Sequence, residues 1–408
     1  MREAENYKKR TELHGIISEN NFEFIKTVNE MTLVHLESEW VKNVKKNKRA
    51  WRKHQRLRAL LGIGKNKAVI GIGSGASFNK NKDVLKRFVN SDGIKPWAER
   101  DFITIAANHQ FKPLLEMGVI PDFVLLVDAS DVVMDQLNKD IPKEARGVQL
   151  ITGVHAHPRV IKEWDRQGRG IVFYTTPSQA IRDVVAEHLK RGKEKHEIEL
   201  GGNVLNGAFM VAAGVLQSTI FMGVGNDLSF KIDDDLDKQR KEYYADGDYS
   251  TNAKVTGTGR DEGKSTKRWG GFSMERKRII SIDEPIGSKR RYDFELDIVG
   301  MSHTLWVYKI WLECTIMGQT NQPVYLHYFN CTEGGTLGVM AKDDSDKAIP
   351  DPNNWYFLDE VCINKHTGKQ MYMTAMLEDA IEIYLKAKRS QQWHNQDARY
   401  AAVLGTQH

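Results

Sequence analysis

The sequence has few cysteines and no long hydrophobic run. Its three cysteines, Cys314, Cys331 and Cys362, are spaced too widely for a CxxC pair or a zinc knuckle, and their odd number argues against a framework of disulfides. No segment approaches the roughly 18 consecutive apolar residues of a membrane-spanning helix. The N-terminal residues MREAENYKKR also lack the apolar stretch of a signal peptide. We therefore expect a soluble, cytoplasmic protein with reduced cysteines.

A large excess of one charge is also absent, because the formal net charge is only +5 over 408 residues. The positive charge is concentrated in residues 42–58, KNVKKNKRAWRKHQRLR, which hold nine Lys or Arg and no acid. This run lies inside a segment predicted to be helical from about Phe22 to Leu60. We favour the solvated face of an N-terminal helical arm. The alternative is a patch for an anionic partner, such as a nucleic acid or a lipid-linked acceptor.

From Lys67 to about residue 230, short apolar runs alternate with amphipathic stretches. The runs are AVIGIG, FITIAAN, DFVLLVD, VQLITGV, GIVFYTT and STIFMGV. Such alternation indicates βαβ units and a parallel sheet covered on both faces. We predict an α/β fold of the doubly wound, mainly parallel, Rossmann-like type, with an N-terminal helical arm and a long insertion.

The first of these strands ends in a glycine turn, VIGIGSGASF, at residues 69–78. The turn formally matches G-x-G-x-x-[G/A], but the next strand ends at Asn108 without the acid that an NAD site requires. Glycines still allow a sharp turn, and free amides before a helix favour an anion. The alternative is a tight turn whose glycines serve packing alone. We expect the turn to hold a phosphate through Gly73, Ser74, Gly75, Ala76 and Ser77.

Polar residues follow the other predicted strands. The carboxyl ends of parallel strands meet at one edge of a sheet, so these residues and the glycine turn should share one site. Asn203 is also placed to cap the helix VLNGAFMVAAGVLQ. The predicted nucleotide site therefore adds Asn108, Asp128, Gly202, Asn203 and Asp227.

Four ordered blocks resemble the MptE-like superfamily, which includes the motility accessory factors that glycosylate flagellin. They are GSGASFNKN, ITIAANHQFKPLLEMGVIPDFVLLVD, GGNVLNGAFMVAAGVLQSTIFMGVGNDLSF and FNCTEGG, between residues 60 and 340. The family turn reads G-P-S-L where this chain has G-A-S-F. The resemblance implies a transferase that uses a nucleotide.

One chemistry of this superfamily is the pterin diphosphokinase reaction. There an acidic cluster of the type T-D-L-D-G follows the third strand and holds the magnesium of ATP, and phosphoryl transfer depends on metal-neutralised phosphates. This chain reads LVDASD, so one acid is in place and the close pair is missing. Under this alternative, Asp128, Asp131 and Asp227 would hold magnesium and the substrate would be a pterin-like alcohol. Otherwise we expect no metal.

A more distant resemblance is to the bacterial sialyltransferases that use a CMP-activated sugar. It implies that Asn108 contacts the donor and that the turn Gly201-Gly202-Asn203 grips the nucleotide. It also implies that Tyr243 and Tyr244 are candidates for binding the leaving phosphate. His303, before the helix LWVYKIWLE and the strand VYLHYFNC, corresponds to the catalytic histidine.

The chemistry of glycosyl transfer suits such a histidine. An acceptor hydroxyl must lose its proton to a base, and an unperturbed pKa of about 6.5 suits neutral pH. Tyrosines and backbone amides can meet the leaving phosphate without metal. A histidine that only begins a helix is the alternative for His303. Three further candidates have weaker support, namely His155 at a strand end and Thr332 and Glu333 in the CTEGG turn.

The favoured function is transfer of a sugar from a CMP- or UDP-linked donor to a hydroxyl on a protein, a glycan or a modified nucleic-acid base. The diphosphokinase is the first alternative, and a non-catalytic module that binds nucleotide and nucleic acid is the second. The expected parts are a basic helical arm (1–64), a nucleotide-binding core (65–230), an insertion or lid (231–295), a completion of the core (296–345) and a C-terminal helical segment (346–408).

Overall fold

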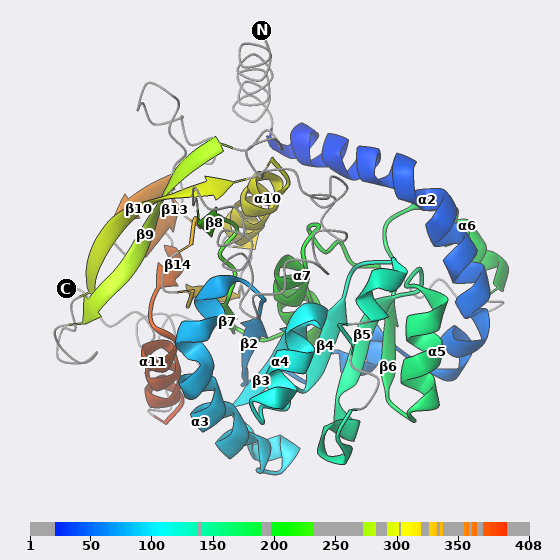
Figure 1. Ribbon diagram of the computed structural model, residues 1–408, viewed down its shortest axis with the longest axis horizontal. Coiled ribbons are helices and arrows are strands. Elements are labelled where there is room, and N and C mark those ends of the chain that lie inside the picture. Colours follow the sequence, from blue (N-terminus) through cyan, green and yellow to red (C-terminus); the bar gives the residue numbers. More distant parts are fainter. Residues whose placement is uncertain are drawn as a thin grey trace, which may run out of the picture.

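The computed structural model describes residues 21–134, 136–137, 141–188, 197–231, 272–282, 292–301, 303–319, 326–332, 335–337, 355–358, 361–364 and 370–389. Its centre is an eleven-stranded sheet in the order β1-β6-β5-β4-β3-β2-β7-β11-β14-β13-β12 (Figure 1). All neighbouring strands from β1 to β14 are parallel, and β13 runs antiparallel to β14 and β12. The predicted doubly wound, mainly parallel α/β fold is confirmed.

The strands of this sheet are short. Their bounds are β1 Gln55–Arg56, β2 Ala68–Ile72, β3 Phe102–Ala107, β4 Phe123–Leu126, β5 Gln149–Gly153, β6 Ile171–Tyr174, β7 Ile220–Val224, β11 His327–Asn330, β12 Trp355–Leu358, β13 Val361–Asn364 and β14 Gln370–Thr374. Every residue of β2, β3, β4 and β7 is buried. This is typical of parallel strands covered on both faces, and it explains why their sequences are continuously apolar.

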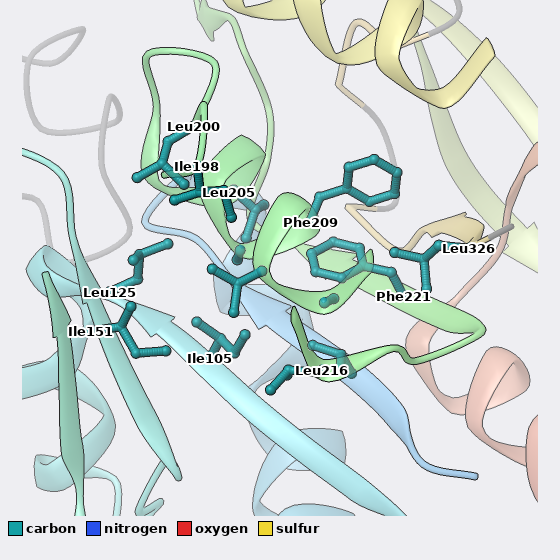
Figure 2. Close-up of a cluster of buried hydrophobic side chains, with 14 of the residues drawn as sticks. Ile105, Leu125, Ile151, Ile198, Leu200, Leu205, Phe209, Leu216, Phe221 and Leu326 are labelled. Carbon is teal, nitrogen blue, oxygen red and sulfur yellow. The ribbon is translucent and has the colours of Figure 1, made fainter. Parts of the chain in front are cut away.

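Helices cover both faces of the sheet. One face packs against α7 (Val204–Met210), the π-helical turn Val211–Leu216 that continues it, and α10 (His303–Gln319). Figure 2 shows this core, where Phe209 of α7 meets Phe221 of β7. The other face packs against α3 (Lys82–Gly93), α4 (Phe111–Glu116), α5 (Pro158–Arg166), α6 (Gln179–His188) and α11 (Leu377–Arg389).

The N-terminal arm is the helix α2 (Asn21–Lys53), which lies along α5 and α6 (Figure 1). Its inner side is buried and includes Val44 and Trp51. The amide of Asn47 donates to the carbonyl oxygens of Val154 at 3.0 Å and Ala156 at 2.7 Å. These contacts fix the arm to the loop after β5, while most of its lysines and arginines are exposed. The described part of the arm therefore carries an exposed basic face, which is compatible with both alternatives, a solvated surface and a patch for an anionic partner.

Two segments contain strands that the sequence analysis does not predict. In the expected insertion, β9 (Phe272–Ile282) and β10 (Tyr292–Met301) form an antiparallel pair, and β8 (Phe230–Lys231) joins β10. The expected C-terminal helical segment does hold α11, but β12, β13 and β14 precede that helix and extend the main sheet. In the part of the chain that the structure describes, no helix is both long enough and apolar enough to span a membrane.

Candidate functional site

The direction in which successive strands are added to the sheet reverses between β2 and β7. From β2 the chain adds β3, β4, β5 and β6 on one side, and then returns to place β7 on the other side of β2. In open α/β sheets, ligands bind outside the carboxyl ends of the strands at such a switch point. The glycine turn, Asn108, Asp128 and Asp227 all follow strands that end at this edge. The parallel pairing of these strands places the four groups along one edge of the sheet, and their contacts with a nucleotide stay a prediction.

The glycine turn packs directly against the loop after β7. The amide of Gly73 donates to the carbonyl of Val224 at 2.7 Å, and the amide of Gly75 donates to that of Gly225 at 3.0 Å. A Cβ atom on Gly73 would lie 2.5 Å from the Gly225 oxygen, so two backbones meet where no side chain fits. The prediction assumed free amides at this turn, and for Gly73 and Gly75 that assumption was wrong, because the pairing of β2 with β7 continues past the strand ends.

The 3-10 helix that follows the glycine turn is already bonded at its start to a carboxylate of the protein. The carboxylate of Asp227 accepts hydrogen bonds from the Ser77 amide at 3.0 Å and from the Ser77 hydroxyl. Ser77 lies in the first turn of the 3-10 helix Ala76–Asn81, whose amide end favours negative charge. In this structure Asp227 therefore takes the place at Ser77 that was predicted for a phosphate. Ser74 and Ala76 are half-buried on the same turn, and their assignment stays a prediction.

Polar side chains also follow the neighbouring strands β3 and β4. Asn108 is buried, and its amide donates to the side-chain oxygen of Gln136. Asp128 is half-buried and accepts a hydrogen bond from the Ser130 amide at 2.7 Å. Asp131 follows in the 3-10 helix Asp131–Met134, but its side chain lies outside the described residues.

The turn Gly201-Gly202-Asn203 holds helix α10. Both glycines have positive φ, +62° and +79°, and a Cβ atom on them would collide with the rings of Trp311 and Tyr308, respectively. The side-chain amide of Asn206 donates to the carbonyls of Gly201 at 3.0 Å and Tyr308 at 2.9 Å. These glycines therefore allow α10 to lie against the start of α7.

Asn203 caps α7 as predicted. Its side-chain oxygen accepts a hydrogen bond from the Asn206 amide at 2.8 Å, and its backbone is extended, as an N-cap requires. Its predicted contact with a nucleotide stays a prediction.

Tyr308 of α10 lies within the electrostatic influence of Asp128, the carboxylate after β4. Burial, and secondly the charge of Asp128, raise the pKa of the Tyr308 phenol to about 12. The phenol therefore keeps its proton at neutral pH and can serve as a hydrogen-bond donor at this edge. Neither Tyr308 nor Gln136 was predicted from the sequence. The glycine pair was the available signal for Tyr308, since adjacent glycines permit another element to approach closely.

His303 is the first residue of α10, five residues before Tyr308. Five residues of α-helix span about 7.5 Å along the axis. The backbone of His303 thus belongs to the helix seated on the Gly201-Gly202 turn, while its side chain lies outside the described residues. The predicted residues Tyr243, Tyr244 and Glu333 also lie outside them.

Two weaker candidates are buried. His155 is only 2% exposed, and its ring lies 4.5 Å from that of Trp40 of α2. Burial lowers the pKa of His155 to about 4, although a hydrogen bond to the Val127 backbone acts in the opposite direction. Thr332 is fully buried, and its hydroxyl donates to the Asn330 side chain at 2.6 Å. Both side chains contribute to packing inside the protein in this structure.

A metal-binding group is not evident among the described residues, where no three His, Cys, Asp or Glu side chains cluster. The carboxylate of Asp227 is bound by Ser77, as described above. The donor set for magnesium predicted under the diphosphokinase alternative, Asp128, Asp131 and Asp227, therefore fits poorly at Asp227.

A parallel sheet with helices on both faces and polar residues at its switch point defines a Rossmann-like α/β protein. Within this class, residues 38–233 match the family model described as "6-hydroxymethylpterin diphosphokinase MptE-like". The chain therefore contains an MptE-like domain.

Among solved structures, the chain distantly resembles the MAf glycosyltransferase from Magnetospirillum magneticum AMB-1. The two are 18% identical with a TM-score of 0.40, and the match covers 68% of this chain and 32% of that one. The chain thus spans about a third of the length of that structure. No curated protein matches the sequence.

Proposed function

We propose that this protein is a transferase that binds a nucleotide sugar at the carboxyl edge of the sheet and moves the sugar to a hydroxyl acceptor. The observation that carries the proposal is the seating of α10, which begins at His303, on the Gly201-Gly202 turn, with Tyr308 of α10 within the electrostatic influence of Asp128. A base at the start of α10 and polar groups at the strand ends would then belong to one site.

Each group has a distinct role in this proposal. The bond between the anomeric carbon and the leaving phosphate oxygen breaks, and its electron pair remains on the phosphate. The acceptor oxygen bonds to the anomeric carbon, and its proton passes to His303. Tyr308, which keeps its proton because its pKa is raised to about 12, would donate a hydrogen bond to the leaving phosphate.

The nucleotide would contact polar groups of the same edge. Asp128 would accept hydrogen bonds from sugar or ribose hydroxyls, because a half-buried carboxylate offers several acceptor positions. Asn108, Ser74 and Asn203 remain the candidates for contacts with the nucleotide. The donor would be linked to CMP or UDP, and no metal is required.

The second candidate is ATP-dependent diphosphoryl transfer to a pterin-like alcohol, which the description of the matching family model favours. In this reaction Asp128, Asp131 and Asp227 would bind magnesium, which would neutralise the phosphates of ATP. The hydrogen bonds from Ser77 to Asp227 count against it, because they occupy one of the three carboxylates.

A turnover experiment separates the two candidates. The purified protein is incubated with a CMP-sugar, a UDP-sugar or ATP, each with magnesium and with EDTA, and the released nucleotides are quantified. We expect release of CMP or UDP in both conditions. Formation of AMP from ATP only with magnesium would instead support the diphosphokinase. Turnover of no nucleotide would reject both reactions and leave a binding module.

Two variants test the assigned residues. A general base contributes about 10²- to 10⁴-fold to rate, so His303→Gln should lower kcat by at least about 100-fold. Asp128→Asn should raise KM for the donor by about tenfold, which corresponds to the loss of one good hydrogen bond to a charged group. Glu144→Gln, which removes an exposed carboxylate from the 3-10 helix Lys143–Gly147, is the matched control and should leave both constants unchanged. Unchanged turnover in His303→Gln would reject the assignment of the base.

A further inference from the structure

Helix α2 carries a row of four exposed cations, Lys42, Lys45, Lys46 and Arg49, which we call the α2 stripe. Their spacing of i, i+3, i+4 and i+7 places them on one face of the helix. The row extends for about 10 Å along the helix axis. Within the described residues, none of the four forms an ion pair or a hydrogen bond.

The stripe differs from the basic residues that follow it on the same helix. Lys53 pairs with Asp165 of α5 at 2.6 Å, and the same carboxylate bonds His54 at 2.9 Å. At the C-terminal end of α2, Asp165 of α5 therefore partly neutralises the positive charge of the helix. Like charges three or four residues apart on one helix repel one another and destabilise the helix. Lys45, Lys46 and Arg49 therefore repel one another without an ion pair to a described carboxylate, and only Glu39, three residues before Lys42, lies near the start of the stripe.

The surroundings of the stripe indicate recognition by charge. The opposite face of α2, with Val44 and Trp51, is buried in the fold, so residues 36–53, the part of the helix whose side chains are described, present no free apolar side to a membrane. No large hydrophobic side chain described as exposed lies on α2; these are Leu61, Ile94, Trp97 and Ile120. A protein partner would find no apolar centre for an interface here. A regular polyanion needs none, because phosphate contacts alone supply affinity.

The stripe also adjoins the candidate site. The side-chain amide of Asn43, next to Lys42, donates to the carbonyl oxygens of Ala129 at 3.4 Å and His155 at 3.2 Å. Ala129 directly follows Asp128 at the carboxyl end of β4. A polymer bound along the stripe would therefore run beside the loop that carries Asp128.

We propose that the α2 stripe is a binding surface for the phosphate backbone of a nucleic acid. Lys42, Lys45, Lys46 and Arg49 each contact a phosphate, and the binding is independent of base sequence. This surface holds the polymer next to the carboxyl edge of the sheet. The binding does not depend on the group transfer proposed above, and either proposal can fail alone.

Fluorescence anisotropy with a labelled single-stranded DNA of about 20 nucleotides, and with its duplex, tests the proposal. Four phosphate contacts predict a slope of log affinity against log salt of about −2.8 for the single strand and −3.6 for the duplex. Between 50 and 200 mM salt, the affinity should then fall by about 50- to 150-fold. The quadruple variant K42Q/K45Q/K46Q/R49Q should bind at least about tenfold more weakly at 100 mM salt and show a flatter slope.

The control variant K86Q/K143Q/K386Q/R389Q removes the same charge from exposed positions on other elements. It should bind like the parent, and the circular dichroism spectra of both variants should match that of the parent. Equal weakening in both variants would show that only net charge matters, which overturns the proposal. Absence of DNA binding by the parent would also overturn it. Binding to phosphatidylserine vesicles without binding to DNA would reject a nucleic acid in favour of a membrane surface.

Discussion

Replacement of Gly202 by alanine should loosen helix α10 from the start of α7. Gly202 has a φ of +79°, and a Cβ atom there would collide with the ring of Tyr308. Left-handed backbone costs a residue with a side chain about 1–2 kcal/mol. Excess atoms in a packed contact cost about 1–3 kcal/mol more. The free energy of unfolding should therefore fall by about 2–5 kcal/mol.

Gly168 provides a matched control, because its φ is +72° and no atom lies within 4 Å of a Cβ built there. Gly168→Ala should cost only the backbone part, about 1–2 kcal/mol. Urea unfolding followed by tryptophan fluorescence measures both variants. In the background of Tyr308→Ala, where the colliding ring is gone, Gly202→Ala should cost no more than Gly168→Ala. An equal cost of Gly202→Ala and Gly168→Ala in the wild-type background would show that the contact between Gly202 and Tyr308 does not hold α10 in place.

Three further predictions concern stability. Asp227→Asn weakens the hydrogen bonds from Ser77 and should lower the free energy of unfolding by about 1.5–3 kcal/mol; an unchanged urea midpoint would contradict it. Asn47→Ala leaves two buried carbonyls without a donor and should cost about 1–3 kcal/mol, also measured in urea. Burial lowers the pKa of His155 from 6.5 to about 4, so the unfolded chain gains the proton first on acidification. The stability that neutral His155 contributes is lost as the pH falls from about 6.5 to 4, and the loss is about 3 kcal/mol at most. His155→Phe should remove this part of the pH dependence of the free energy of unfolding, measured by calorimetry.

The parallel core was predictable because its strands are buried on both faces. A run such as FITIAA has no polar alternation, so it differs plainly from the amphipathic helices on either side. The parallel topology also predicted that the carboxyl ends of these strands lie along one edge of the sheet. Asn203 was also predictable as a cap, because the helix signal is local in sequence.

The functions of the glycines were not predictable, because phosphate binding and close packing require the same residue type. The sequence does not reveal that Gly73 meets Gly225, or that Tyr308 lies on Gly202, since these residues are far apart along the chain. Asp227 at a strand end was compatible with a ribose, a metal or a turn, and only the fold brings Ser77 to it. The strands β9 and β10 were missed because their charged residues resemble those of a solvated loop.

Hydrogen exchange with and without a saturating nucleotide would locate the bound nucleotide along the chain. We propose that the nucleotide binds at the carboxyl edge of the sheet. CMP or UDP should therefore slow amide exchange in the peptides that carry Asn108, Asp128 and the Gly201-Gly202-Asn203 turn. Exchange in α11 should not change, because Tyr384 of this helix donates to the carbonyls of Asn66 and Asp101 at the opposite, amino ends of β2 and β3. Protection confined to other parts of the chain, or no protection by CMP, UDP or ATP with magnesium, would contradict a nucleotide site at this edge.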